Sequence, residues 1–455
     1  MTRDFEIVRG IYNAFNPAPL PAGSKLYVDC QDVRGGSNVL VALGDTIRFS
    51  DQPTCQLYTG HRGGGKSTEL LRLKQDLEGK GCTVVYFSAE DTDINPEDVE
   101  YTDILIACTR HLLETVREAD PNPVLNWFKE RLQALQDAML TEINFNNPSV
   151  EFGIPDLVKI TTGFKTQPTQ RAELRKVLNP FADQLVDALN HFIADAQKKL
   201  PENRRRLILI ADGLEKVTLV TRADGRTNHD EIFIDHSEQL RRLDCDVIYT
   251  VPISLVLSSR GPDLMETYNC TPHVLPMVMT QNRQDEEHGP ALEIVYEIIQ
   301  SRVNSVAAAQ GMELATQVFD DPETLKQLCL MSGGHVRNLM LLVQTAIKYN
   351  EQEALPIRAS GLMQAVRQLR KIYRDAVNAD QWDLLAAVYE TKQIINDQAH
   401  RQLLFNRCLL EYCDEESWHN VHPVLKDVSE FQLALAKRQS HRSNQQATEA
   451  SVTTP

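Results

Sequence analysis

The chain has 455 residues, 42% of them hydrophobic, which is enough for two or three packed domains. Its 47 Lys and Arg against 63 Asp and Glu give a net charge of −16, which favours solubility and disfavours bulk attraction to nucleic acid. The chain contains no apolar run long enough to span a membrane, no signal-peptide core at its start and no paired cysteine motif, so we expect a cytoplasmic protein with reduced thiols and no membrane partner.

The first part of the chain has the pattern of a βαβ unit. Residues 1–50 mix loop signals with short apolar stretches and form an N-terminal segment. Residues 55–60 predict a strand that ends in glycine, 67–81 a helix with leucines at helical spacing, and 83–89 a buried strand. This order of elements is the building block of a parallel sheet, so we expect an α/β core over 51–280.

The core is expected to contain a large helical insertion. Residues 90–200 are mostly of helical pattern, and the stretch 141–169 interrupts them as a small hairpin or loop. Further buried strands are expected at 207–211, 246–252 and 273–279, where apolar and β-branched residues follow one another.

The last third of the chain predicts two smaller modules and a tail. Helical patterns over 281–375 indicate a helical lid domain. Residues 376–432 read as helices followed by two apolar runs around an acidic turn, which is typical of a winged-helix-like module. Residues 433–455 are polar and are expected to be disordered.

A phosphate-binding loop is predicted between the first strand and the first helix of the core. The stretch TGHRGGGKST fits the pattern Gly-x-x-x-x-Gly-Lys-Ser, and its flanking strand and helix argue against an ordinary glycine-rich surface turn. Glycines allow the backbone N–H groups to approach an anion, and the following helix presents its positive end. Lys66 is expected to reach the β- and γ-phosphates, and the Ser67 hydroxyl to hold Mg²⁺. The residues predicted to bind the nucleotide here are Gly60, His61, Arg62, Gly63, Gly64, Gly65, Lys66, Ser67 and Thr68.

Two acids follow the strand predicted at 207–211. Asp212 ends the apolar run, where a nucleotide hydrolase needs a carboxylate for Mg²⁺. Glu215 lies three residues further on and is expected to polarise the attacking water. The alternative for Asp212 is a helix cap after the strand.

The two motifs together resemble those of the AAA+ and STAND branches of the P-loop ATPases. The resemblance extends to DVIYTVP, which is similar to a sensor strand, and to MSGGHVRNLMLLV, which is similar to an element of the helical lid. It implies that Thr250 contacts the γ-phosphate or the water, that Arg337 reaches the nucleotide from the lid, and that the Mg²⁺ strand lies beside the phosphate-loop strand. The implied fold class is α/β, with a P-loop NTPase parallel-sheet core, a helical insertion, a helical lid and a C-terminal winged-helix-like module.

The sequence also departs from the family pattern. Val336 stands where the lid element often has proline. No guanine-reading motif is evident, so ATP is favoured over GTP. We expect the protein to self-associate, and an arginine acting in trans is then expected. Arg260 is the first candidate, and Arg171 and Arg175 are weaker ones; an ordinary surface arginine is the alternative for Arg260.

Three functions are compatible with these motifs. The preferred one is an ATP-hydrolysing switch that acts on an unknown protein effector in signalling or defence. The alternative is a DNA-binding ATPase similar to origin-recognition or DNA-processing proteins, although the stretch 394–407 contains only two arginines as basic residues. The third is a nucleotide-binding scaffold without hydrolysis, which Glu215 disfavours.

Overall fold

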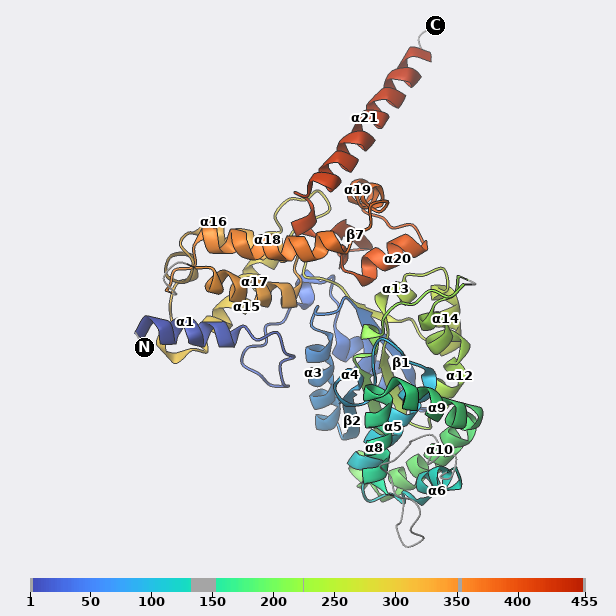
Figure 1. The fold of residues 1–455 in the computed structure, drawn as a ribbon. Coiled ribbons are helices and arrows are strands. Elements are labelled where there is room, and N and C mark those ends of the chain that lie inside the picture. Colours follow the sequence, from blue (N-terminus) through green and yellow to red (C-terminus); the bar gives the residue numbers. More distant parts are fainter. Residues whose placement is uncertain (1–2, 132–152, 224, 351–353, 453–455) are drawn as a thin grey trace. The chain divides into compact units, whose positions relative to one another are not determined.

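The computed structural model describes residues 3–131, 153–223, 225–350 and 354–452 (Figure 1). These residues form two compact units. The sheet unit comprises residues 39–59 and 69–274. The lid unit comprises residues 1–38, 60–68 and 275–455, so the phosphate loop belongs to it by its contacts. The separate domain boundaries expected at 281 and 376 remain predictions.

The sheet unit is built on a five-stranded sheet in the order β2-β3-β4-β1-β5. Strands β2, β3, β4 and β1 run parallel, as the βαβ pattern predicted. The prediction that the strand ending in Asp212 lies beside the phosphate-loop strand is wrong, because β4 pairs with both and separates them. The strands are β1 Cys55–Gly60, β2 Cys82–Ser88, β3 Arg206–Asp212, β4 Asp246–Thr250 and β5 His273–Leu275.

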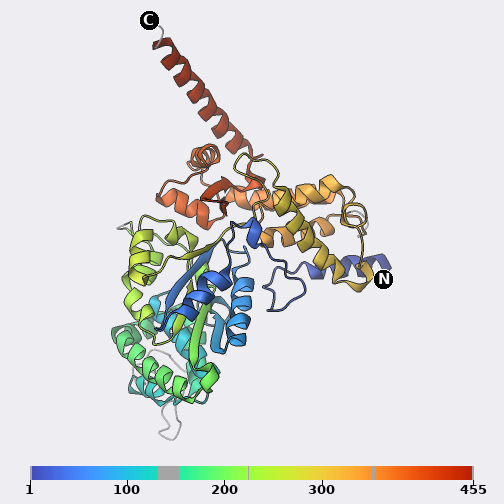
Figure 2. The same ribbon diagram turned by 180° about the vertical axis from the view of Figure 1, so that it is seen from behind.

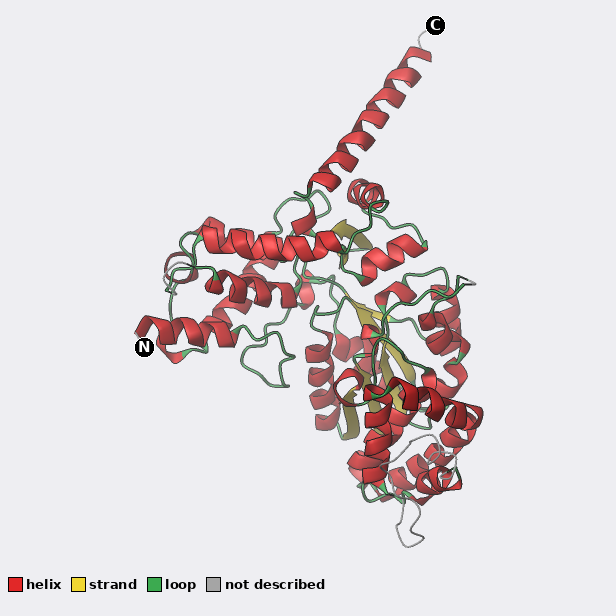
Figure 3. Ribbon diagram, viewed as in Figure 1, coloured by secondary structure: helices red, strands yellow, loops and turns green. Residues whose placement is uncertain are grey.

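The helices of the sheet unit include most of the predicted insertion. In Figure 3 the described part of that insertion is helix and loop. The hairpin or loop expected at 141–169 lies partly outside the described residues; within them the expectation is wrong, because 154–166 is helical. The helices are α2 Thr46–Phe49, α3 Lys66–Gly79, α4 Ala89–Thr92, α5 Tyr101–Thr115, α6 Asn122–Glu130, α8 Ile154–Thr166, α9 Pro168–Leu178, α10 Ala182–Lys199, α11 Asn228–Asp230, α12 Ser237–Arg241, α13 Ile253–Val256 and α14 Gly261–Tyr268.

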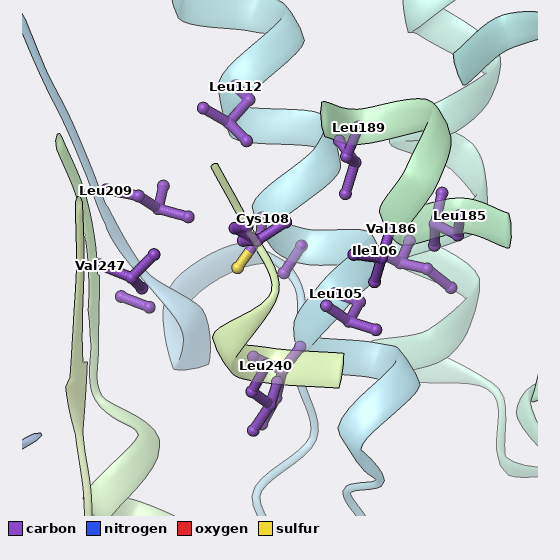
Figure 4. Close-up of a cluster of buried hydrophobic side chains, with 14 of the residues drawn as sticks. Leu105, Ile106, Cys108, Leu112, Leu185, Val186, Leu189, Leu209, Leu240 and Val247 are labelled. Atoms are coloured by element: carbon purple, nitrogen blue, oxygen red, sulfur yellow. The ribbon is translucent and has the colours of Figure 1, made fainter. Parts of the chain in front are cut away.

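The core of the sheet unit joins the insertion to the sheet. Figure 4 shows Cys108 of α5 between Leu189 of α10 and the strand residues Leu209 and Val247, with Leu105 of α5 nearby. All of these side chains are buried in one apolar cluster. Because each buried leucine contributes roughly 1.5–3 kcal/mol, the insertion is an integral part of the sheet unit's core.

In the lid unit the N-terminal helix packs against a group of helices from the last third of the chain. Helix α1 packs against α15 and α17, and the Gln344 side chain donates a hydrogen bond to the Tyr12 carbonyl at 3.0 Å (Figure 2). The N-terminal segment is therefore packed with the lid helices. These helices are α1 Arg3–Ala14, α15 Gly289–Asn304, α16 Pro322–Met331, α17 Val336–Lys348 and α18 Ala359–Asp375.

The C-terminal part of the lid unit has two helices followed by a hairpin; that it is a winged-helix-like module remains a prediction. Strands β6 and β7 pair antiparallel, with Glu411 opposite His419. The tail expected to be disordered from 433 is instead helical as far as Val452, since α21 continues through it. Among the described residues, no helix has the length and apolarity required to cross a bilayer. The elements are α19 Trp382–Thr391, α20 Gln398–Phe405, β6 Leu409–Cys413, β7 Ser417–Val421 and α21 Ser429–Val452.

Candidate nucleotide site

The phosphate loop has the backbone conformation that its glycines predicted. Gly60, Gly63 and Gly65 have φ angles of 143°, 84° and 112°. At Gly63 a side chain is excluded by space as well, because a Cβ there would lie 2.6 Å from His335 Cε1 and 2.8 Å from Arg337 Cβ. The start of the lid helix α17 therefore packs directly on the loop.

Lys66 is buried at the first position of α3, with 3% of its surface exposed. Its Nζ donates to the carbonyls of Gly60 at 2.9 Å and His61 at 3.0 Å. The ammonium group is thus held inside the loop, where its charge is available to an anion that approaches the same peptide groups.

The other loop residues have more varied surroundings. The Thr68 hydroxyl accepts a hydrogen bond from the Leu20 amide at 3.1 Å, so the N-terminal segment contacts the end of the loop. Ser67 is half-buried. The Arg62 guanidinium lies 3.8 Å from the ring centroid of Phe405, a cation–π contact with the end of α20.

Arg337 contacts the loop through its backbone. Its amide donates to the Gly63 carbonyl at 3.1 Å, and its side chain is half-buried. Two further residues contact the loop although no sequence motif indicates a role for them. The Nε2 of His335 donates to the Arg62 carbonyl at 2.6 Å. The Arg34 guanidinium donates to the Gly64 carbonyl at 2.7 Å.

Asp212 lies at the carboxyl end of β3 and is 1% exposed. Its Oδ1 accepts from the Gly213 amide at 2.7 Å, and its Oδ2 accepts from the Tyr86 hydroxyl at 2.8 Å. Burial and the neighbouring Asp212 carboxylate raise the pKa of Tyr86, which keeps the phenol protonated as a donor. The Tyr86 hydroxyl thus fixes one oxygen of the carboxylate, a role that no sequence motif indicates.

Glu215 and Thr250 meet through the turn that follows β3. Glu215 is buried in the short 3₁₀ helix Leu214–Lys216. The Thr250 hydroxyl at the end of β4 accepts from the Leu214 amide at 2.9 Å and donates to the Ala211 carbonyl at 3.4 Å. Thr250 thus anchors the turn that carries Glu215; its predicted contact with the γ-phosphate or water remains a prediction.

The candidate trans-acting arginines differ in exposure. The Arg260 guanidinium pairs with Asp235 at 3.1 Å and Asp263 at 3.3 Å and keeps 27% of its side chain exposed. Arg171 and Arg175 are buried in ion pairs with acids of their own unit, so a neighbouring chain cannot reach them. Arg260 is therefore the candidate that remains accessible.

His61 joins the phosphate loop to the C-terminal hairpin. The ring is 1% exposed, and its Nε2 accepts from the Glu411 amide of β6 at 2.9 Å. Burial lowers the pKa of His61 well below its ordinary range, which keeps Nε2 unprotonated as an acceptor. The Glu411 carbonyl in turn accepts from the Met277 amide at 2.9 Å, so the hairpin is also bound to residue 277 of its own unit.

The Glu411 carboxyl predicts a pH dependence of stability. Its Oε1 accepts from Ser417 at 2.6 Å, and its Oε2 has no hydrogen-bond partner within the described ranges. Burial raises the pKa of Glu411 from 4.5 to about 7 in the folded protein. The folded chain therefore binds the proton more tightly than the unfolded chain, and stability falls as the pH rises from about 4.5 through about 7.

We expect Glu411→Gln to remove this loss of stability. The shift corresponds to at most about 3 kcal/mol, so the variant should gain up to that much over the wild type at pH 9, but little at pH 5. Urea unfolding at both pH values measures the difference. Glu416→Gln on the exposed hairpin turn is the control. An equal gain at both pH values would contradict the assignment to Glu411.

Comparisons with known proteins give distant structural similarity. No protein-family model matches the chain, and no curated protein matches its sequence. The Walker-type ATPase PABY2304 of Pyrococcus abyssi is 11% identical with a TM-score of 0.41, over 90% of this chain and 98% of that one. Cdc6p from Pyrobaculum aerophilum is 10% identical with a TM-score of 0.39, over 94% and 98%. The Aeropyrum pernix ORC1 protein, solved in complex with DNA, is 12% identical with a TM-score of 0.35, over 88% and 90%. At such low values, an assignment of function depends on the site itself.

Proposed function

We propose that the protein is a Mg²⁺-dependent ATPase. The sheet carries the proposal, because the strand that leads into the phosphate loop and the strand that ends in Asp212 are parallel members of one sheet, with only β4 between them. Parallel α/β sheets bind ligands at the carboxyl ends of their strands. Lys66 at the start of α3 and the buried acids after β3 are the residues that phosphoryl transfer to water requires.

The residues have separate roles in this proposal. The loop amides and Lys66 bind the phosphates, and Ser67 and Asp212 hold Mg²⁺, with Tyr86 fixing the Asp212 carboxylate through its hydroxyl. Bound Mg²⁺ neutralises charge that develops on the transferred phosphoryl group. Glu215 accepts a proton from the attacking water, and Thr250 fixes the backbone turn from which Glu215 extends.

Hydrolysis would drive a switch that acts on a protein partner. His61 and Arg62 contact β6 and α20, so the loop that binds phosphate also touches the C-terminal module. Nucleotide binding that moves either residue would change these contacts, and self-association through Arg260 is compatible with its exposure.

A DNA-binding ATPase is the second candidate. The order of two helices and a hairpin at the C-terminus favours it. The net charge of −16 opposes it, as does the scarcity of basic residues in 394–407, where Arg401 and Arg407 are the only ones.

Phosphate release from ATP by the purified chain tests the proposal. We expect release with Mg²⁺ and none with excess EDTA. Stimulation by duplex DNA that decreases steeply with salt would favour the second candidate. Oligomerisation that depends on ATP and not on DNA, measured by light scattering, would favour the switch. Absence of both nucleotide binding and release in the wild type would overturn the proposal.

A further inference from the structure

Successive carbonyl groups of the phosphate loop all accept hydrogen bonds from side chains or amides of the lid unit. Lys66 donates to the first two carbonyls, those of Gly60 and His61. The next three accept from two segments. The Arg62 carbonyl accepts from His335 at 2.6 Å and the Gly63 carbonyl from the Arg337 amide at 3.1 Å, whereas the Gly64 carbonyl accepts from Arg34 at 2.7 Å. The donors to these three carbonyls, which we call the carbonyl clamp, come from the start of α17 and from the segment before the sheet.

The protonation of His335 is determined by its two neighbours. Its Nδ1 accepts from the Asn338 amide at 3.1 Å and so caps α17. The proton therefore lies on Nε2, which donates to the Arg62 carbonyl. The ring is 1% exposed, and burial lowers the pKa of His335 to about 3, so the neutral tautomer persists at any physiological pH. One side chain thus fixes the beginning of the lid helix and a peptide group of the loop.

The clamp determines the direction of the loop amides. In a trans peptide the C=O of one residue and the N–H of the next point in opposite directions. Fixing the carbonyls of Arg62 and Gly64 toward the clamp therefore turns the N–H groups of Gly63 and Gly65 away from it. When such amides lie on one side of a loop, they form an anion-binding concavity. A flip of either peptide would leave the buried His335 or Arg34 donor without its acceptor.

We propose that His335 and Arg34 are positioning residues that hold the phosphate loop ready for nucleotide through its carbonyls. Neither residue needs to touch the ligand, because they act through the peptide groups that bind it. Their loss should weaken ATP and ADP to a similar extent, since the loop contacts phosphates that both nucleotides contain. The inference rests on the proposed nucleotide site and extends it to residues outside the motif.

The test uses variants that keep the fold. His335→Asn retains a good N-cap for α17 but is too short to reach the Arg62 carbonyl. Arg34→Lys retains the positive charge and loses the guanidinium group that donates to the Gly64 carbonyl. His288→Asn is the matched control, because His288 also caps a lid helix, α15, through its side chain.

We expect the dissociation constants of ADP and of a non-hydrolysable ATP analogue, measured by calorimetry on the full chain, to rise about 3- to 10-fold in His335→Asn and Arg34→Lys. KM for ATP should rise by a similar factor, with kcat nearly unchanged, because the loss affects ground state and transition state alike. His335→Gln, whose amide can donate at a similar reach, should recover part of the affinity.

Three outcomes would overturn the inference. The first is unchanged affinity in both folded variants. The second is an equal loss in His288→Asn, which would indicate a general effect on lid stability. The third is the absence of nucleotide binding by the wild type, which overturns the proposed function as well. Thermal unfolding without nucleotide identifies a variant that does not fold. In that case the nucleotide affinity of the other clamp variant tests the inference.

Discussion

Replacing Lys66 with alanine should reduce ATP hydrolysis by at least about 100-fold, the effect of removing one preorganised charged donor from a phosphoryl-transfer site. The buried ammonium group donates to the Gly60 and His61 carbonyls, at 2.9 and 3.0 Å. Bound phosphate offers it stronger, charged acceptors. Alanine removes this charge, so binding of ATP should weaken together with its hydrolysis.

Glu215→Gln should separate these two effects. The amide is nearly isosteric with the carboxylate but cannot take a proton from water, so hydrolysis should fall about 100-fold while ATP still binds. Steady-state phosphate release and calorimetric titration measure the two quantities. Lys74→Ala is the control for the first variant, because Lys74 lies on the same helix and pairs with Glu78 at the surface. Full activity in Lys66→Ala would exclude the loop as the catalytic site.

Local sequence patterns predicted the elements that surround the site. Five consecutive apolar residues at 207–211 require burial on both faces, and they form most of β3. The glycine spacing of 60–65 predicted a loop whose backbone can approach an anion, and three of its glycines have positive φ angles. In both cases the information lies within a few neighbouring residues, so it can be read without the fold.

Contacts between distant segments could not be predicted in the same way. Tyr86 meets Asp212 because β2 and β3 are adjacent with Ser88 opposite Asp212, and no local pattern fixes that register. The position of β4 between β1 and β3 is likewise a property of the whole sheet. No sequence motif distinguishes His335. Its position directly before α17 is a local signal of a helix cap, but its contact with Arg62 depends on the tertiary structure.

Gly334→Ala should destabilise the protein by more than about 4 kcal/mol, a loss expected only when rigid backbone must move. Gly334 has a φ angle of 69° in the turn between α16 and α17. A Cβ there would lie 2.7 Å from the Val278 carbonyl carbon and nearer still to its oxygen. A side chain can rotate away from such a clash, but a backbone carbonyl cannot.

The appropriate control is Gly311→Ala. Gly311 has a similar φ angle of 79°, but apart from its chain neighbours no atom of the described residues lies within 4 Å of the position of its Cβ. The free energy of unfolding of that variant should fall only by the cost of the left-handed conformation, about 1–2 kcal/mol. Urea unfolding of both variants separates the cost of the backbone conformation from the cost of the steric clash. Equal losses of stability in the two variants would contradict the close approach at Val278.

The packing of Gly334 also affects the site. Gly334 precedes His335 and Arg337, and the hydrogen bonds of these residues to the loop require α17 to begin at this position. If a Gly334→Ala protein still folds, its nucleotide affinity should therefore fall with its stability, whereas Gly311→Ala should retain the affinity of the wild type.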